Sequence, residues 1–506
     1  MSSQSNTFVR KKVAIVGSGC SGIAALWALN RTYHDVHLYE AADRLGGHTN
    51  TVQWSVGKYK TSVDTGFIVL NSATYRQIAY LWPRPPSTAN FINFLKKAGV
   101  DTEPTEMGFS VSRDNGAFEW ATSSLAAIFS QKRRIFSPRT WRMIFDIVRF
   151  NQFALDLLHT QHDDRPVGGS AAVNGIDGEE TIGAYLARQG YSDAFRDDYL
   201  LPIAAALWST SPDKSRLEWL TLKDGAQSYI DAVMRGFPPN HLHLKTAVRN
   251  LSNDTDGTVL LQLENGKTEK FDHVILATHA DEALSILGST ATAQERSILS
   301  CFEFSQNEAV LHSDLAFMPR RKKAWSSWNY LTQSTPSTGK ATINKVSLTY
   351  NMNILQRIPR NPFGDILVTI NPLQRPNPST VQGRYYYSHP LYTASTVRAQ
   401  KQLRHIQNKR GISYIGAWTN YGFHEDGFSS GLAVAKDHLG AKLPFEFKDS
   451  TYSRGKVPQL GLKDYILRFF ILLVHVFVVL VFERLAAIGQ PKSRPVLNKK
   501  LHGKRQ

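Results

Sequence analysis

A glycine-rich loop near the start of the chain constrains the fold more than any other feature. Residues Lys12–Val16 are a short, mostly apolar segment that predicts a strand, and the sequence GSGCSG follows directly at residues 17–22. Residues Ile23–Arg31 then have the pattern of a helix, and Val36–Tyr39 that of a second strand. This order predicts a βαβ unit that binds a dinucleotide.

Each glycine of the loop has its own physical reason. Gly17 permits the tight turn, Gly19 lets the backbone approach a pyrophosphate, and Gly22 lets helix and strand pack closely. The free N–H groups at the start of the helix then face the phosphates. Ser18 and Ser21 complete the candidate phosphate-facing loop.

An acidic residue supports the same interpretation. Glu40 ends the second predicted strand, 23 residues after Gly17. Its carboxylate can accept hydrogen bonds from a ribose hydroxyl, and it would repel the 2′-phosphate of NADP.

The segment after Glu40 points to FAD. Residues 40–49, EAADRLGGHT, match a Glu-x3-Arg-x-Gly-Gly pattern. This pattern resembles the FAD-dependent amine oxidase and phytoene desaturase superfamily, in particular its branch of predicted NAD/FAD-binding flavoproteins. The resemblance implies that Arg44 supplies a bidentate charge to phosphate or nearby cofactor oxygens. It also implies that Gly46 and Gly47 let the backbone pass against the cofactor.

The resemblance covers roughly residues 10 to 445. It rests on VDTGFI at 63–68, MGFSV at 107–111, DYLLP at 198–202 with LWS at 207–209, FDHVILATH at 271–279, SSWNY at 326–330, GAW at 416–418 and YGFHEDG at 421–427. It implies an α/β fold, in which a Rossmann-like FAD-binding domain of the amine oxidase type carries an inserted α+β substrate domain. The expected ranges are 10–72, 235–285 and 405–445 for the FAD domain, and 73–234 and 286–404 for the substrate domain.

The last motif makes physical sense in such a fold. A helix is expected over Phe428–Leu439, and its N-terminal N–H groups near Gly427 would face the flavin pyrimidine edge. The side chains of His424, Glu425 and Asp426 either cap this helix or contact the cofactor. The candidate cofactor-binding residues are therefore Gly17, Ser18, Gly19, Ser21, Gly22, Glu40, Arg44, Gly46, Gly47, Thr65, Gly66, Val248, Gly416, Glu425 and Gly427.

No side chain is identified as a catalytic acid or base, and flavin chemistry does not require one. The single histidines His279, His312 and His389 are interpreted as structural. Trp325, Trp328 and Tyr330 either wall a pocket or pack in a core. The two cysteines, Cys20 and Cys301, lack the pattern of a disulfide framework, and no metal-ligand spacing is visible, so no metal is expected.

The charge pattern indicates a membrane partner and not nucleic acid. The formal net charge is +17, yet no nucleic-acid recognition module is present. Residues 451–506 contain eleven Lys or Arg and two acidic residues, next to the apolar run Phe469–Phe482. We expect a C-terminal apolar, membrane-associating helix at 460–485 and a basic tail at 486–506. A shallow helix is favoured over a transmembrane helix, because the residues after Phe482 are rich in Lys and Arg. The expected location is the cytosolic face of an intracellular membrane.

These features predict an FAD-dependent oxidoreductase that abstracts hydride from a hydrophobic small molecule, with a fatty-acyl or other lipid substrate favoured. One alternative is a flavin-containing amine oxidase that uses oxygen. The other is a flavin-binding membrane scaffold without catalysis. Two departures from the family pattern bear on this choice: residues 76–89 are an insertion, and an aromatic segment with an Asn-His pair is lacking between Glu218 and Trp219. Both are either genuine features of the chain or gene-model errors, and the second falls in the substrate domain.

Overall fold

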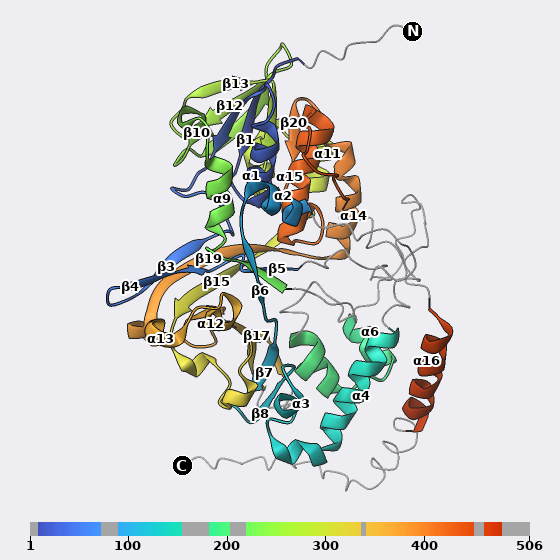
Figure 1. Cartoon of the computed structure of the whole chain (residues 1–506). Coiled ribbons are helices and arrows are strands. Elements are labelled where there is room, and N and C mark those ends of the chain that lie inside the picture. Colours follow the sequence, from blue (N-terminus) through green and yellow to red (C-terminus); the bar gives the residue numbers. More distant parts are fainter. Residues whose placement is uncertain are drawn as a thin grey trace, which may run out of the picture. The chain divides into compact units, whose positions relative to one another are not determined.

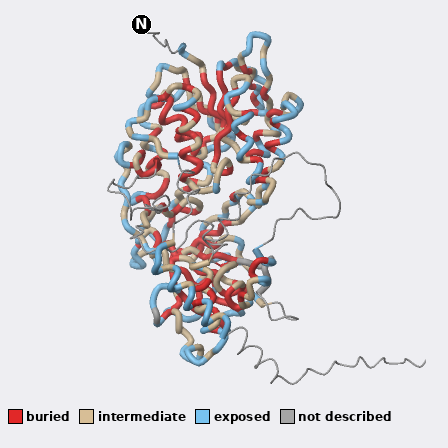
Figure 2. Tube along the Cα trace, turned by 90° about the vertical axis from the view of Figure 1, so that its right-hand side faces the viewer, coloured by how far each residue is buried: buried red, intermediate tan, exposed pale blue. Residues whose placement is uncertain are grey.

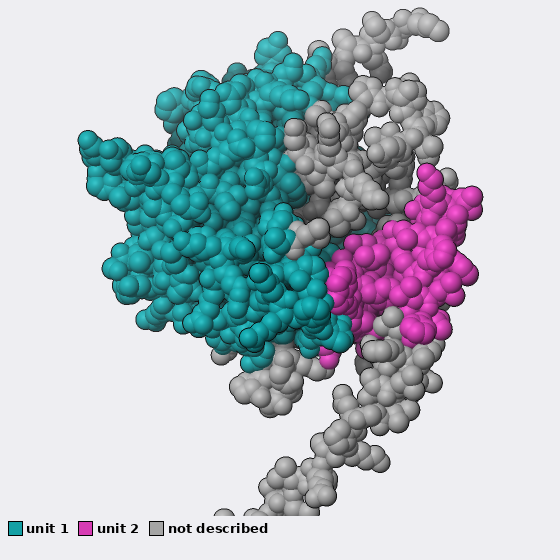
Figure 3. Space-filling view, turned by 60° about the horizontal axis from the view of Figure 1, so that its bottom comes forward, with its two compact units in different colours: residues 1–140, 196–456 teal, residues 141–195, 457–506 magenta. Residues whose placement is uncertain are grey.

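The computed structural model describes residues 9–71, 90–153, 182–202, 219–334, 341–449 and 460–477 (Figure 1). Several of the features expected from the sequence lie outside the described residues. They are the insertion at 76–89, residues 203–218 with the LWS motif, residues 478–485 of the expected C-terminal helix and the tail at 486–506. The chain forms two compact units (Figure 3). Unit 1 comprises Met1–Thr140 and Arg196–Lys456, and unit 2 comprises Trp141–Phe195 and Val457–Gln506. The three ranges expected for the FAD domain belong to unit 1.

A parallel five-stranded sheet is the centre of unit 1, and it draws its strands from three distant parts of the chain. Val13, Ile15 and Leu38 point to one face of this sheet, and Ala14 and Val16 point to the other. Both faces are buried, as expected of a parallel sheet with helices on both sides (Figure 2). The strand order is β10 (Leu242–His243), β2 (Asp35–Tyr39), β1 (Lys12–Val16), β14 (His273–Leu276) and β20 (Ile412–Tyr414).

Two helices from opposite ends of the sequence pack on this sheet side by side (Figure 1). They are α1 (Cys20–Leu29) and α15 (His424–Leu439). Their contact is close because Gly431 has no side chain: a Cβ there would overlap the carbonyl oxygen of Ser21. Helices α2 (Asn90–Ala98) and α9 (Gln227–Met234) complete this face. The other face is covered by α10 (Ala280–Leu287), α11 (Ala293–Leu299), α14 (Ala394–Gln402) and the sheet of β11 (Val248–Asn253), β12 (Val259–Leu263) and β13 (Thr268–Phe271).

A seven-stranded mixed sheet forms the second layer of unit 1. Its strand order is β19 (Val381–Leu391), β15 (Glu303–His312), β18 (Leu367–Ile370), β17 (Ala341–Asn351), β16 (Trp328–Ser334), β7 (Phe109–Arg113) and β8 (Phe118–Ala121). Two small sheets accompany it: β3 (Thr51–Val56) with β4 (Tyr59–Asp64), and β5 (Val69–Asn71) with β9 (Trp219–Leu222) and β6 (Thr102–Thr105). Short helices connect these strands: α3 (Leu125–Ile128), α12 (Met352–Leu355) and α13 (Arg360–Phe363).

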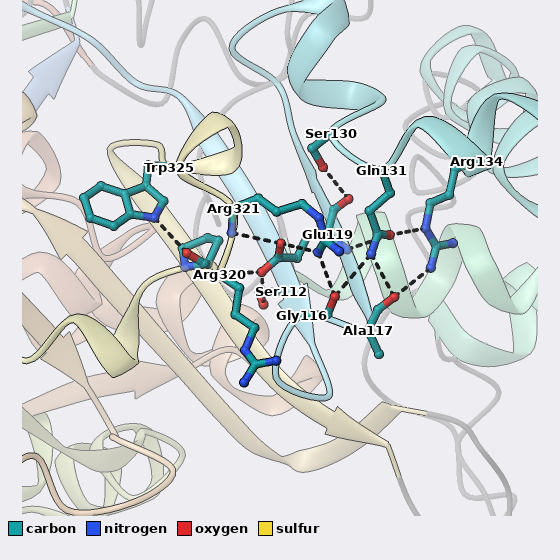
Figure 4. Close-up of polar contacts among 11 residues, drawn as sticks. Ser112, Gly116, Ala117, Glu119, Ser130, Gln131, Arg134, Arg320, Arg321 and Trp325 are labelled. Atoms are coloured by element: carbon teal, nitrogen blue, oxygen red, sulfur yellow. Dashed lines mark hydrogen bonds and ion pairs between the residues drawn. The ribbon is translucent and has the colours of Figure 1, made fainter.

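A buried carboxylate ties strand β8 to a distant loop. Glu119 is 0% exposed, and its oxygens accept hydrogen bonds from the backbone N–H groups of Arg320 at 2.6 Å and Arg321 at 3.2 Å. The guanidinium of Arg321 and the hydroxyl of Ser112 also donate to it, at 2.8 and 3.0 Å (Figure 4). The carboxylate of Glu119 is therefore the shared acceptor for these four donors.

Unit 2 contains the C-terminal helix α16 (Leu462–His475) and most of α4 (Pro138–Phe153), together with α6 (Ile182–Arg188) and α7 (Asp193–Phe195). One side of α16 packs on α4: Ile471 is buried, and Arg468 donates to the carbonyl oxygen of Gln152. The other sides expose large apolar side chains, such as Phe469 and Phe470, each at 59%. None of the helices in the described ranges has the length and hydropathy needed to cross a membrane.

Candidate functional site

A cavity of about 1460 Å³ lies at the carboxyl ends of β1, β2, β14 and β20. In open α/β sheets, ligands bind at this edge. The volume exceeds the ~300–1,000 Å³ that is typical of small-molecule pockets, so a dinucleotide and a second molecule can fit together. Of the fifteen residues predicted to contact the cofactor, thirteen line this cavity, and the other two, Gly22 and Gly427, lie behind its wall.

The three glycines of the loop differ in what surrounds them. Gly17 has φ +102°, and a Cβ there would lie 2.9 Å from the carbonyl oxygen of Ala277. A Cβ on Gly22 would overlap the carbonyl oxygen of Gly17, so the helix can approach the loop only at a glycine. Gly19 faces open space, because a Cβ there would have no other atom within 4 Å.

This open space lies where an anion would bind. Helix α1 begins at Cys20 with Gly19 as its N-cap, three residues before the predicted start, because the N–H of Ile23 donates to the carbonyl oxygen of Gly19 at 3.0 Å and so closes the first turn. Gly19, Cys20 and Ser21 all line the cavity. The positive end of α1 therefore faces a space that no side chain fills, which fits a pyrophosphate group.

Glu40 directly follows β2 and is hydrogen-bonded to the glycine loop. Its Oε2 atom accepts hydrogen bonds from the backbone N–H of Ser18 at 2.9 Å and from its hydroxyl at 2.5 Å. Its Oε1 atom accepts from the N–H of Ala42 at 2.9 Å. A carboxylate has about four acceptor positions, so Glu40 can still accept from a ribose hydroxyl in the cavity.

We expect Glu40→Ala to weaken FAD binding at least tenfold, because a charge-assisted hydrogen bond contributes about 1.5–3 kcal/mol. Titration of the FAD-free chain with FAD, followed by fluorescence, measures this change. Asp43→Ala removes an exposed carboxylate outside the cavity wall and is the matched control. Unchanged affinity in Glu40→Ala would show that Glu40 does not contact the ribose.

Arg44 braces the loop that follows Glu40. Its guanidinium donates to the carbonyl oxygens of Gly47 at 2.8 Å and Thr49 at 3.3 Å. Gly46 and Gly47 have φ values of +110° and +56°, and a Cβ on Gly47 would lie 3.3 Å from the Cα of Gly19. Arg44 also lines the cavity, so it shapes the loop and presents a positive charge to the cofactor region.

Thr65 and Gly66 form the wall beyond this loop. Thr65 is buried, and its hydroxyl lies 2.7 Å from the hydroxyl of Tyr387 and 3.1 Å from the amide of Asn50. A Cβ on Gly66 would overlap the carbonyl oxygen of His48. This polar cluster joins the β3–β4 region to strand β19 of the second sheet.

Val248 and Gly416 reach the cavity from two other elements. Val248 is the first residue of β11, and Gly416 lies two residues after the end of β20. The N–H of Gly416 donates to the hydroxyl of Ser430 at 3.0 Å, which links this turn to α15.

Helix α15 begins at His424 and not at Phe428 as expected. The reason is the side chain of Asp426, which accepts a hydrogen bond from the N–H of Phe423 at 3.0 Å and so closes the first turn. Gly427 lies inside this turn, where a Cβ would be 2.6 Å from the Cys20 sulfur. Burial raises the pKa of the Cys20 thiol to about 12, in keeping with its interpretation as a packing residue.

Glu425 acts on a different helix. Its two oxygens accept hydrogen bonds from the N–H groups of Asn90 at 2.8 Å and Phe91 at 2.9 Å, which are the first residues of α2. Burial raises the pKa of this carboxyl group to about 7. Glu425 thus caps α2, although it also lines the cavity.

Histidines line the cavity in a way that the sequence did not reveal. His48 and His424 are half-buried beside it, and each has a buried Nε2 atom with no hydrogen-bond partner among the described residues. Burial lowers the pKa of each to about 3. His279 and His389, interpreted as structural, also line the wall. His312 is structural as expected: it is buried in the second sheet, with Nε2 2.7 Å from the hydroxyl of Thr369.

Of the three aromatic residues considered in the sequence, one lines the cavity and two pack elsewhere. Trp328 lines the cavity, together with Tyr386 and Tyr387 of β19. Tyr330 is buried in the second sheet, and the indole of Trp325 donates to the carbonyl oxygen of Pro319 at 2.7 Å.

The low pKa of His424 makes the free energy of unfolding depend on pH. The unfolded chain binds a proton on this residue below about pH 6.5, and the folded chain does so only near pH 3, so the free energy of unfolding falls as the pH falls. Between about pH 7.5 and about pH 5.5, the loss is about 1.4 kcal/mol. His424→Gln should lack this component, as measured by urea unfolding of the FAD-free chain. Asp64 and Glu425, whose pKa values burial raises to about 7, are present in both proteins and cancel. Parallel pH curves would contradict the assignment.

The fold and the glycine loop define a flavoprotein-type oxidoreductase. The family model for flavin-containing amine oxidoreductases matches residues 20–298, more than half of the chain. The chain belongs to this family, and its cofactor is FAD.

Two solved structures share the fold. Cyclohexylamine oxidase from Brevibacterium oxydans has a TM-score of 0.57 at 14% identity, covering 85% of this chain and 99% of that one. A fatty acid isomerase from P. acnes has a TM-score of 0.52 at 13% identity, covering 84% and 98%. Tryptophan 2-monooxygenase from Pseudomonas savastanoi is 36% identical over 97 residues, which are 19% of this chain and 14% of that enzyme.

Proposed function

We propose that the cavity holds FAD and, beside it, a hydrophobic substrate from which hydride is removed. Glu40 would bind the ribose, the N-terminus of α1 would bind the pyrophosphate over Gly19, and the loop at Gly46 and Gly47 would pass along the cofactor. FAD supplies the hydride acceptor. The N-terminus of α15 would stabilise the negative charge that hydride acceptance places on the ring.

The proposed substrate class rests on the apolar side chains that line one wall of the cavity. The second sheet contributes apolar and aromatic side chains to the wall: Phe304, Trp328, Leu348, Tyr350, Ile370 and Tyr387. The three carboxylates of the wall are already engaged: Glu40 with Ser18, Glu425 with α2, and Glu282 with the N–H of His279 at 3.0 Å. An apolar molecule can therefore bind without desolvating an unpaired charge.

A fatty-acyl or other lipid substrate fits this wall best. The resemblance in fold to a fatty acid isomerase is in keeping with a lipid ligand. The chain's own contribution would be to orient the reacting C–H bond and to exclude water, while the unpartnered Nε2 atoms of His48 and His424 offer polar contacts in the same cavity as the apolar side chains of the second sheet.

Amine oxidation with oxygen is the second candidate. Its support is the amine oxidoreductase family and the fold of cyclohexylamine oxidase. A neutral amine, or a cation held against the rings of Tyr386 and Tyr387, could use the same wall.

Anaerobic reduction of the bound flavin distinguishes these functions. We expect a long-chain unsaturated fatty acid to bleach the visible absorbance of the bound flavin, because the flavin accepts the hydride. We expect cyclohexylamine to leave this absorbance unchanged. Ile370→Asn should raise the fatty acid concentration needed without altering FAD content, whereas Leu315→Asn, an exposed leucine outside the cavity, should have no effect. Bleaching by the amine with peroxide release in air would favour the amine oxidase. A flavin that neither compound reduces would favour the non-catalytic scaffold.

We further propose that α16 binds the enzyme to the cytosolic face of an intracellular membrane. The exposed apolar side chains of this helix, including Leu462 at 77% and Tyr465 at 58%, support the proposal, as does the basic composition of the residues after Phe482. Deleting residues 458–506 should leave a soluble, FAD-loaded protein that no longer sediments with anionic vesicles. If the shortened chain aggregates without flavin, the segment is part of the fold and the proposal fails.

A further inference from the structure

A cluster of metal-ligating side chains lies at the edge of the five-stranded sheet, away from the cavity. Asp35 and His37 are two residues apart on β2, so their side chains point to the same face of the sheet. His241 directly precedes the neighbouring edge strand β10, which pairs with β2 in parallel. About 200 residues separate His241 from Asp35 and His37 in the sequence, and the fold brings the three together. None of the three residues lines the cofactor cavity.

The spacing of the ligand atoms fits one small cation. Oδ1 of Asp35 lies 3.3 Å from Nε2 of His37 and 3.6 Å from Nδ1 of His241. One ligand atom from each of the three residues lies within 4.8 Å of the others. Bonds of about 2.0–2.1 Å to a tetrahedral zinc ion place its ligands about 3.4 Å apart, close to these two separations. The rings of His37 and His241 stack with centroids 4.2 Å apart, so one ring has to turn for both nitrogens to face the same ion.

The next side chain outward supports the same geometry. Nδ1 of His37 lies 3.2 Å from Nε2 of His243, which in turn stacks on Tyr39 with ring centroids 4.3 Å apart. When Nε2 of His37 binds a metal, Nδ1 carries the proton and donates a hydrogen bond to Nε2 of His243. A histidine ligand is usually held by such a second hydrogen bond, which fixes its tautomer and its orientation.

The site is open to solvent on one side. The side chains of Asp35, His37 and His241 are 29%, 13% and 25% exposed, so an ion can enter and water can complete its coordination. The neighbouring cation is already paired, because Lys12 lies 3.7 Å from Glu269. Nδ1 of His241 also lies 3.1 Å from the carbonyl oxygen of Val36. A metal at Nδ1 requires the tautomer with the proton on Nε2, so this hydrogen bond would be lost when the metal binds.

We propose that Asp35, His37 and His241 form a binding site for a divalent transition metal ion, for which Zn²⁺ is the probe. Two imidazoles and one carboxylate are ligands that suit zinc and its neighbours in the first transition row. The bound ion joins the two-residue strand β10 to β2. This edge also holds Glu40, whose N–H donates to the carbonyl oxygen of His243 at 2.9 Å.

Calorimetric titration of the full-length, FAD-loaded chain with Zn²⁺ alone tests this proposal. We expect one ion per chain, with an affinity that falls at acidic pH, since ligands must be deprotonated. Asp35→Asn and His241→Gln should each bind Zn²⁺ at least about tenfold more weakly. His405→Gln, which removes an exposed histidine elsewhere in unit 1, should bind as the unsubstituted chain does.

Co²⁺ provides a second measurement that needs no substitution. In the unsubstituted chain, it should give the intense visible absorption of a tetrahedral complex, and added Zn²⁺ should remove that absorption. The proposal is overturned if the unsubstituted chain binds no Zn²⁺, if Asp35→Asn and His241→Gln bind it as tightly as the unsubstituted chain, or if Co²⁺ gives only the weak spectrum of its aqueous ion.

Discussion

Gly22→Ala is expected to yield a chain that is poorly folded and carries little or no FAD. The added methyl group would overlap the carbonyl oxygen of Gly17, and both groups belong to backbone that is fixed by strand β1 and helix α1. Inserting a methyl group into such a contact costs about 3 kcal/mol or more. Urea unfolding of the FAD-free chain and the flavin content of the purified protein measure the two effects.

Gly19→Ala separates the loop's two roles. The new methyl group would meet nothing within 4 Å, so the FAD-free chain should be about as stable as before. It would stand in the space assigned to the pyrophosphate, so FAD affinity should fall. Equal effects of both substitutions on the stability of the FAD-free chain would contradict the distinction. Tight FAD binding by Gly19→Ala would contradict the position of the pyrophosphate.

Glu119→Ala should destabilise the protein by about 3–5 kcal/mol, the range for removing one partner from a buried charged pair. It would leave the N–H groups of Arg320 and Arg321 and the hydroxyl of Ser112 without their acceptor (Figure 4). Glu119→Gln keeps one acceptor oxygen and should lose less. Urea unfolding curves at a single FAD concentration measure both losses.

The matched control is an exposed ion pair in the same sheet system. Glu308 of β15 accepts from Arg384 at 2.7 Å, and the two side chains are 28% and 38% exposed. Glu308→Ala should therefore cost no more than about 1 kcal/mol. If Glu119→Ala is as mild as this control, Glu119 does not tie β8 to the 320–321 loop.

The local part of the site was predictable from the sequence. A strand, the GSGCSG loop and Glu40 are close in the chain, and each obeys a local backbone rule that identifies its role before any packing is known. The strands β1 and β2 were confirmed within one residue. The start of α15 was wrong by four residues, because Asp426 closes a turn through a side-chain hydrogen bond that hydrophobic periodicity does not report.

The remaining parts depend on contacts between distant segments. Glu425 caps α2 across more than 300 residues, and no local pattern links the two. The aromatic wall from β19 and the histidines at 48, 279 and 389 meet only when the second sheet packs over the cofactor cavity. The same holds for Asp35 and His241, whose separation hides any metal-ligand spacing, so the sequence-based expectation of no metal site has to be tested by experiment.

The functional account depends on one combination of features. In the proposed function, the N-terminus of α1 and Glu40 would bind a dinucleotide, and the apolar side chains of the second sheet would bind a second molecule. A cavity that holds only a small ligand would need neither this volume nor both kinds of wall. The same combination explains why no protein side chain has to act as an acid or base, since the cofactor accepts the hydride.

The most direct test of this account is the identity and stoichiometry of the nucleotide released from the purified full-length chain by heat or acid. The account predicts FAD, identified by mass, at one molecule per chain, and rebinding of FAD to the emptied protein in preference to FMN or NADP⁺. It would be contradicted by a folded chain that releases FMN or NADP⁺ in place of FAD, or that binds no dinucleotide when FAD is supplied in excess.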